Sequence, residues 1–375
     1  MPRICPEIES MIISGMQFDG DSFANILRPK FEHLTKLVLQ SCEVKPSVPF
    51  INRTSGNNFS PNYFEHIRLV GEYLPNLEEL VVQNMKIKEL SLREAFRNLY
   101  KLRALEISHC FLRGFCFKDL SLTCTAITLN GCRIDEQGFH MLMYRLGSRL
   151  EYLEFNNEDT HNINRDEQVY FDLICRYCSK LRKVTFKADT DLSVDKIGQL
   201  TALTDLNLCV NRVLDFNAQL TGSKVNHLYL NCDELYSRTL MNMVLRHSFL
   251  SHVFIFTKNA NSLKEGIEKV ALIPNLTSLT FLSKNGTIAG DIITTIIERS
   301  STLSHLRIAT LTVKDSIYLF NALFRFGGMN PCRKITVECR LEKSAAVNKE
   351  VMKRLPANIT LRFVQRWETD FWYYP

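Results

Sequence analysis

One apolar motif recurs along this chain and limits what it can fold into. Its clearest copy is Leu34-x-x-Leu37-x-Leu39-x-x-Cys42. Equally clear copies begin at Leu102 and Leu203, and looser ones begin at Ile8, Leu77, Cys124, Leu150, Leu181, Val225, Leu250, Leu276, Leu303 and Cys332, with a last, frayed copy around Pro356, Ile359 and Leu361. From Leu77 onward, successive copies begin 22 to 31 residues apart. Random apolar clustering would not keep this phase, so the chain is built from repeats.

The spacing within the motif predicts a short strand followed by a sharp turn. Side chains alternate along a strand, so the fourth and sixth positions enter the core together with the first. At the ninth position a buried Asn can bond the turn backbone, and a small Cys can occupy the same space. Cys42, Cys110 and Cys132 fall at this position, and we expect them to be buried structural thiols.

The residues between the strands predict helices with one apolar face. Asp21 and Ser22, Ser91, Asp135 and Asp166 are candidate helix starts, and later helices are expected from about Ser237, Leu263, Ala289, Asp315 and Ala345. The repeats beginning at Leu181 and Leu203 leave room for only a turn or two of helix. Two polar stretches, Lys45–Asn62 and Glu158–Arg165, interrupt the rhythm and are predicted to be surface loops.

Strand, turn and helix repeated in this way predict an α/β leucine-rich-repeat solenoid, a horseshoe with a parallel β-sheet on its concave face and helices on its convex face. The prediction covers residues 1–365 as a single domain of about 13–14 irregular repeats. Residues 366–375 form a separate aromatic tail.

Composition narrows the class of protein. The formal net charge is only +6 over 375 residues, which disfavours dedicated nucleic-acid binding. We find no signal peptide and no apolar run long enough to span a bilayer, so the twelve cysteines are interpreted as reduced thiols of a cytoplasmic or nuclear protein.

The usual signatures of catalysis are missing from the sequence. No phosphate loop, nucleophile elbow or metalloprotease helix occurs. The pair Cys175-x-x-Cys178 stands alone, and His227 with His252 has only Asp205 nearby as a third ligand. We therefore expect no enzyme activity, no metal and no cofactor.

The repeat resembles the leucine-rich-repeat portion of F-box/LRR proteins. The resemblance rests on the Cys42, Cys110 and Cys132 turns and on the phrase Leu129-Asn130-Gly131-Cys132-Arg133-Ile134. It implies a substrate receptor of an SCF-type ubiquitin ligase, which binds the Skp adaptor, and through it a cullin, by an F-box that precedes the repeats. A repeat already begins at Ile8, so these partners would require an F-box outside this chain.

A partner protein is expected on the concave face, where the third, fifth and seventh positions of each strand point. The candidate docking residues are mostly aromatic or basic: Tyr152, Lys183, Lys187, His227, Tyr229, His252, Phe254 and Phe256. His227 and His252 should be neighbours, as should Tyr229 and Phe254. The alternative is a register shifted by one residue, which would bury the aromatic residues and expose Leu228 and Val253 instead.

The aromatic tail leaves two interpretations open. Trp367, Phe371 and Trp372 could cap the apolar end of the last repeat. They could instead fold over the concave face or bind a partner.

Three functions therefore follow from the sequence. The chain is a non-enzymatic interaction scaffold that presents a client protein to a ubiquitin ligase, or a free-standing scaffold or inhibitor, or, least favoured, an RNA-associated repeat protein that uses its basic C-terminal part.

Overall fold

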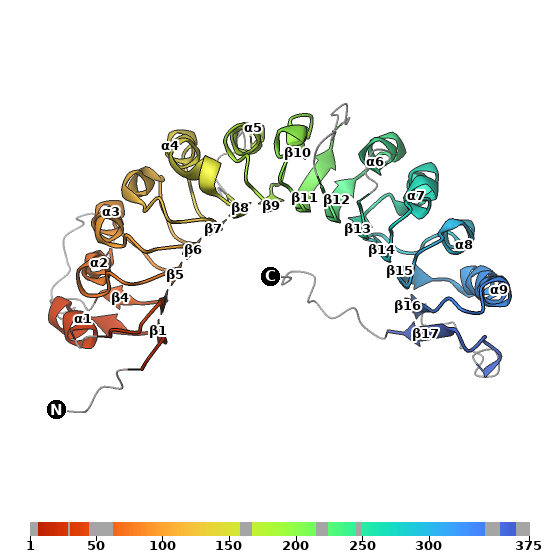
Figure 1. Cartoon of the computed structure of the whole chain (residues 1–375), viewed down its shortest axis with the longest axis horizontal. Coiled ribbons are helices and arrows are strands. Elements are labelled where there is room, and N and C mark those ends of the chain that lie inside the picture. Colours follow the sequence, from red (N-terminus) through yellow and green to blue (C-terminus); the bar gives the residue numbers. More distant parts are fainter. Residues whose placement is uncertain are drawn as a thin grey trace, which may run out of the picture. The chain divides into compact units, whose positions relative to one another are not determined.

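The computed structural model describes residues 7–28, 31–44, 63–157, 167–214, 224–244, 249–341 and 353–364. Contacts divide the chain into two compact units, Met1–Lys187 and Ala188–Pro375. In each unit, parallel strands form a sheet and helices pack on one of its faces (Figure 1). The opposite face, which we call the open face, carries none of the described helices. The extent of a single domain over 1–365 stays a prediction.

The Met1–Lys187 unit has the strand order β1-β3-β5-β6-β7-β8-β9. These strands are β1 (Ser10–Ser14), β3 (Lys36–Gln40), β5 (Glu79–Gln83), β6 (Ala104–Ser108), β7 (Ala126–Asn130), β8 (Tyr152–Asn156) and β9 (Lys183–Lys187), and a small second sheet joins β2 (Gln17–Phe18) to β4 (Glu43–Val44). The helices are α1 (Gly20–Leu27), α2 (Arg68–Tyr73), α3 (Glu89–Asn98), α4 (Glu136–Leu146) and α5 (Gln168–Tyr177), and a 3-10 helix, η3 (Phe115–Asp119), replaces the α-helix between β6 and β7.

The Ala188–Pro375 unit has the order β11-β12-β13-β14-β15-β16-β17, with β10 paired to β11. Its strands are β10 (Asp191–Leu192), β11 (Asp205–Val213), β12 (His227–Glu234), β13 (His252–Thr257), β14 (Ser278–Ser283), β15 (His305–Leu311), β16 (Ile335–Leu341) and β17 (Ile359–Phe363). Its helices are α6 (Ser237–Val244), α7 (Lys264–Ala271), α8 (Gly290–Arg299) and α9 (Val313–Met329). As predicted, only a short 3-10 helix, η5 (Ile197–Gln199), follows the repeat at Leu181.

The turn after each early strand uses left-handed backbone at the eighth motif position. The residues are Gly15, Ser41, Asn84, His109 and Gly131, with φ between 50° and 65°. Each donates its backbone N–H to the carbonyl of the last residue in the next strand, at 2.8–2.9 Å. Positive φ is uncommon outside glycine, and this hydrogen bond extends the strand ladder by one residue and holds the turn.

The ninth-position cysteines are buried, as the spacing predicts. The Sγ of each lies against the backbone carbonyl oxygen of the sixth-position residue in the preceding repeat. The distances are 3.4 Å from Cys42 to Ile13, 3.8 Å from Cys110 to Val82 and 3.2 Å from Cys132 to Ile107. A weak thiol donor therefore links each turn to the strand of the preceding repeat, and burial raises the pKa of the Cys110 thiol to about 11.

Two of the predicted helix starts need correction. Ser91 does not cap a helix, since α3 already begins at Glu89 after Lys88, and Ser91 is a core-facing residue only 5% exposed. Helix α1 begins at Gly20, capped by Asp19, whose Oδ1 accepts from the Ser22 N–H at 2.7 Å. Asp135 is the N-cap residue of α4, as predicted. The expected helix at Ala345, the start at Asp166 and both polar loops lie outside the described residues.

The repeat predicted to begin at Cys332 is displaced by two residues. Its spacing would pair Leu306 with Ile335, but Leu306 pairs with Val337, and a further register irregularity follows between Ile308 and Thr310. Cys332 itself is exposed. Since side chains alternate with a period of two, this shift leaves the same residues facing the core, and the ladder continues through β17.

Candidate partner-binding surface

The strand register decides which side chains face outward in the second unit. Leu228 is 4% exposed and Val253 is 2% exposed, so both point into the core. Tyr229, Phe254 and Phe256 alternate with these buried residues and lie half-buried on the open face. The register shifted by one residue is therefore wrong, and the predicted outward positions are confirmed.

Five of the predicted docking residues lie together on β12 and β13: His227, Tyr229, His252, Phe254 and Phe256. We call them the aromatic cluster. Register pairs join His227 to His252 and Tyr229 to Phe254. The Tyr229 and Phe254 rings stack with centroids 4.1 Å apart and an interplanar angle of 8°, and the two imidazoles lie 4.6 Å apart. The neighbours predicted from strand spacing are thus confirmed.

Polar groups border the histidine end of the aromatic cluster. The Nδ1 of His227 lies 2.6 Å from the Asp205 Oδ1. Burial lowers the pKa of His252 below its usual value, and the nearby His227 and His305 lower it further.

Phe256 lies at the other end of the cluster, under a cation that sequence reasoning missed. The Nζ of Lys284 lies 5.2 Å from the Phe256 ring centroid and 3.0 Å from the Asp233 Oδ1. Lys258 reaches the same carboxylate at 2.5 Å. Both lysines come directly after the last residue of a strand. They could have been found in the sequence by also examining the residues that follow the seventh position of each repeat.

Tyr152, Lys183 and Lys187 belong to the Met1–Lys187 unit, on β8 and β9. The Lys183 Nζ lies 5.4 Å from the Tyr152 ring centroid. Glu154, which the prediction omitted, joins the other groups, since it accepts from the Tyr152 hydroxyl at 3.1 Å and from the Lys187 Nζ at 2.8 Å. Burial, and then Glu154, raises the pKa of Tyr152 to about 12.

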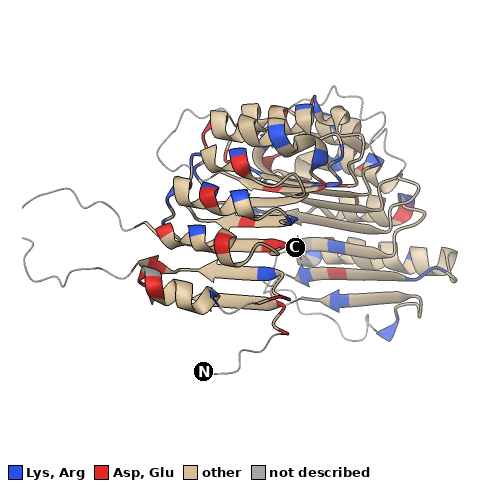
Figure 2. Cartoon of the chain, turned by 60° about the vertical axis from the view of Figure 1, so that its left-hand side comes forward, with Lys and Arg blue, Asp and Glu red and all other residues tan. Residues whose placement is uncertain are grey.

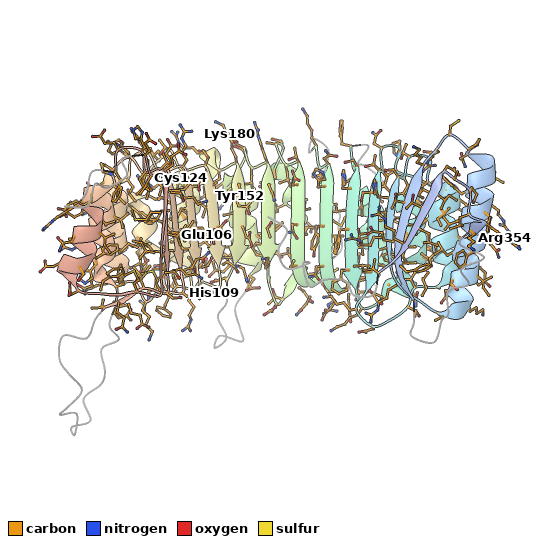
Figure 3. All side chains as sticks on the ribbon, turned by 90° about the horizontal axis from the view of Figure 1, so that it is seen from below. Glu106, His109, Cys124, Tyr152, Lys180 and Arg354 are labelled. Atoms are coloured by element: carbon orange, nitrogen blue, oxygen red, sulfur yellow. The ribbon has the colours of Figure 1, made fainter. Side chains whose placement is uncertain are left out.

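Figure 3 shows the sheet face-on, so that residues in the middle of the strands can be told from residues at the strand ends. Glu106 and Tyr152 project from the middle of their strands, whereas His109 and Lys180 lie at opposite edges. Glu106 accepts from the Gln83 Nε2 at 2.7 Å. Pairs of polar side chains therefore link adjacent strands across this open face.

The remaining sequence candidates do not form a reactive site in the described part of the chain. Cys178 is buried with its Sγ 3.6 Å from the Met143 Sδ, and burial raises its pKa to about 12. Within the described ranges, no group of three or more His, Cys, Asp or Glu side chains could hold a metal ion. No helix among the described residues is long and apolar enough to cross a membrane. Trp367, Phe371 and Trp372 lie outside the described residues.

Comparison with known proteins identifies the fold. No family model and no curated protein matches the sequence. An internalin (inlF) from Listeria monocytogenes str. 4b F2365 aligns over 96% of this chain and 88% of its own, with a TM-score of 0.53 and 13% identity. TLR13, solved as a TLR13-ssRNA13 complex, aligns over 88% of this chain and 43% of its own, with a TM-score of 0.46 and 14% identity. With the internalin likeness and the strand-turn-helix repeats, the chain has an α/β leucine-rich-repeat fold.

Proposed function

We propose that this protein is a non-enzymatic scaffold that binds a partner protein on the open face of its sheet, with the aromatic cluster at the centre of the contact. The observation that carries the proposal is the stacked Tyr229–Phe254 pair, half-buried on a face that no described helix covers. Interface centres are enriched in such aromatic side chains. Because the rings are already held by their strands and by each other, binding costs little side-chain entropy.

The surroundings of the cluster support a protein partner. His227 with Asp205 lies at one end, and Lys258 and Lys284 with Asp233 lie at the other. An apolar centre with a polar, partly exposed rim is the usual composition of a protein–protein interface. Tyr152, Lys183 and Lys187, with Glu154, are proposed as a separate contact region of the first unit.

Capture of the partner by alanine variants tests the proposal. Wild-type protein, the double variant Tyr229→Ala/Phe254→Ala and the control Phe249→Ala are used as bait under identical conditions. Phe249 is 57% exposed and precedes β13, outside the aromatic cluster. We expect one stoichiometric partner with the wild type and the control, and at least tenfold less with the double variant, since central aromatic residues cost about 2 kcal/mol or more. Equal capture by all three would contradict the proposal.

The resemblance to F-box/LRR proteins supports a finer version, in which the partner is a substrate of an SCF-type ubiquitin ligase. The Skp adaptor and a cullin should then co-purify with the chain. Capture of a partner without the Skp adaptor and a cullin would contradict the ligase role but would still agree with a scaffold. Loss of all bound material on RNase treatment would instead favour the RNA-associated function.

A cytoplasmic or nuclear location is part of the same proposal. Most cysteines of the described part are buried, and buried reduced cysteines are typical of proteins in a reducing compartment. Fractionation of cells that express the chain tests this directly.

A further inference from the structure

A strip of cations lies beside the aromatic cluster on the open face of the Ala188–Pro375 unit. Neighbouring strands there carry Lys and Arg with acidic residues between them (Figure 2). The cations are Lys258, Lys284, Arg307, Arg340 and Arg362, and the carboxylates among them are Asp233 and Glu338. We call these seven residues the basic strip.

The carboxylates of the basic strip do not neutralise it. Asp233 is shared between two lysines, at 2.5 and 3.0 Å. Glu338 is shared between Arg307 at 2.8 Å and Arg362 at 3.7 Å. Five positive charges therefore face two negative ones, and the surplus of three favours an acidic occupant next to an aromatic one.

The end of the chain, residues 365–375, contains both acidic and aromatic side chains. They follow Val364, whose backbone N–H still donates to the Cys339 carbonyl at 3.0 Å beside β16. The segment contains one basic residue, Arg366, two acidic residues and five aromatic ones, the acidic and aromatic residues in the order Trp367, Glu368, Asp370, Phe371, Trp372, Tyr373 and Tyr374. Both tryptophans of the protein lie within it.

The segment is also long enough to reach the basic strip and the aromatic cluster. An extended chain spans about 3.3 Å per residue, and strands lie about 4.8 Å apart. Asp370 can therefore reach roughly 20 Å from Val364, which is more than the three strand spacings, about 14 Å, from β17 to β14, the strand that Lys284 follows. Phe371 and Trp372 can reach roughly 23–26 Å, the four or five strand spacings from β17 to β13 and β12.

We propose that residues 366–375 bind in cis across the open face of this unit, with Glu368 and Asp370 on the basic strip and Phe371 and Trp372 on the aromatic cluster. The inference goes beyond the proposed function, because the contact needs no partner. If a partner also binds the cluster, it has to displace the tail, which would make the tail a built-in competitor.

Tryptophan fluorescence of the full chain tests the contact, since every signal comes from the tail. In the wild type we expect blue-shifted emission and shielding from acrylamide, compared with the chain in denaturant. The double variant Tyr229→Ala/Phe254→Ala should shift the emission to the red, because each lost aromatic contact lowers the ratio of docked to undocked tail by about two- to tenfold. Phe249→Ala should leave the emission unchanged.

A second variant changes only residues of the tail and none of the repeats. Glu368→Lys/Asp370→Lys places positive charges against the basic strip and should also expose both tryptophans, and added salt should weaken docking in the wild type. This tail variant decides the question even if the alanine variant fails to fold, as circular dichroism would reveal. Exposed tryptophans in the wild type overturn the proposal. Tryptophans that are shielded but insensitive to the tail variant also overturn it, and indicate a cap on the last repeat.

Discussion

Substitutions on β12 give a direct test of which side chains are core and which are surface. Leu230 is 0% exposed, whereas its neighbour Tyr229 is half-buried on the open face. Leu230→Ala should lower the free energy of unfolding by about 3–4 kcal/mol, since truncation of a buried Leu loses its transfer free energy and leaves a cavity. Tyr229→Ala should cost only about 1 kcal/mol, mainly the ring stacking on Phe254.

Urea titration followed by far-UV circular dichroism measures both values. Ile255→Ala and Phe254→Ala on β13 repeat the comparison, because Ile255 is fully buried and Phe254 is only half-buried. The slope with urea should be similar for all four variants, so that the midpoints report stability. A cost for Tyr229→Ala equal to or above that of Leu230→Ala would place the aromatic residues in the core and refute the register.

Three further predictions concern the rest of the molecule. Gly138→Ala should destabilise the chain by roughly 3 kcal/mol or more, because the added Cβ would lie 2.0 Å from the Arg113 carbonyl oxygen. The control Gly328→Ala has open space around it and should be neutral or stabilising by about 0.5–1 kcal/mol. Thermal melts measure both effects. Lys258 and Lys284 hold the pKa of Asp233 below its usual value, so the stability that Asp233 contributes is present above about pH 4 and is lost as the pH falls through the lowered pKa. Asp233→Asn should therefore weaken the dependence of stability on pH in the acid range. An unchanged dependence would contradict this. Among the described cysteines, the exposed Cys332 should react first with iodoacetamide at pH 8, as peptide mapping would show, and earlier labelling of a buried thiol would contradict the packing.

The repeat was predictable from the sequence because burial depends on simple alternation. The first, fourth and sixth positions must be apolar to bury the strand, so Leu34, Leu37 and Leu39 define both the strand and its inward face. The same alternation predicts that Tyr229 and Phe254 lie side by side, and the register pair confirms it.

The errors arise where local signals compete with packing. Ser91 is a residue type that often caps helices, but α3 already begins at Glu89, and both Ser91 and Leu92 are buried within it. The two-residue slip near Cys332 keeps alternation intact, so the apolar pattern contains no trace of it. Strand spacing locates Glu154 and Lys284, but their ion pairs with Lys187 and Asp233 depend on side-chain geometry that spacing does not give.

Site-specific photo-crosslinking tests the central claim most directly, because it reports which face of the protein the partner touches. A photoreactive amino acid is placed at Phe254 or Phe256 on the open face, and at the exposed Tyr318 on α9 as the helix-face control. The account predicts that the captured partner is crosslinked from positions 254 and 256 and not from 318. Crosslinking from 318 alone would show that the partner binds the helices, and would contradict a binding surface built on the aromatic cluster.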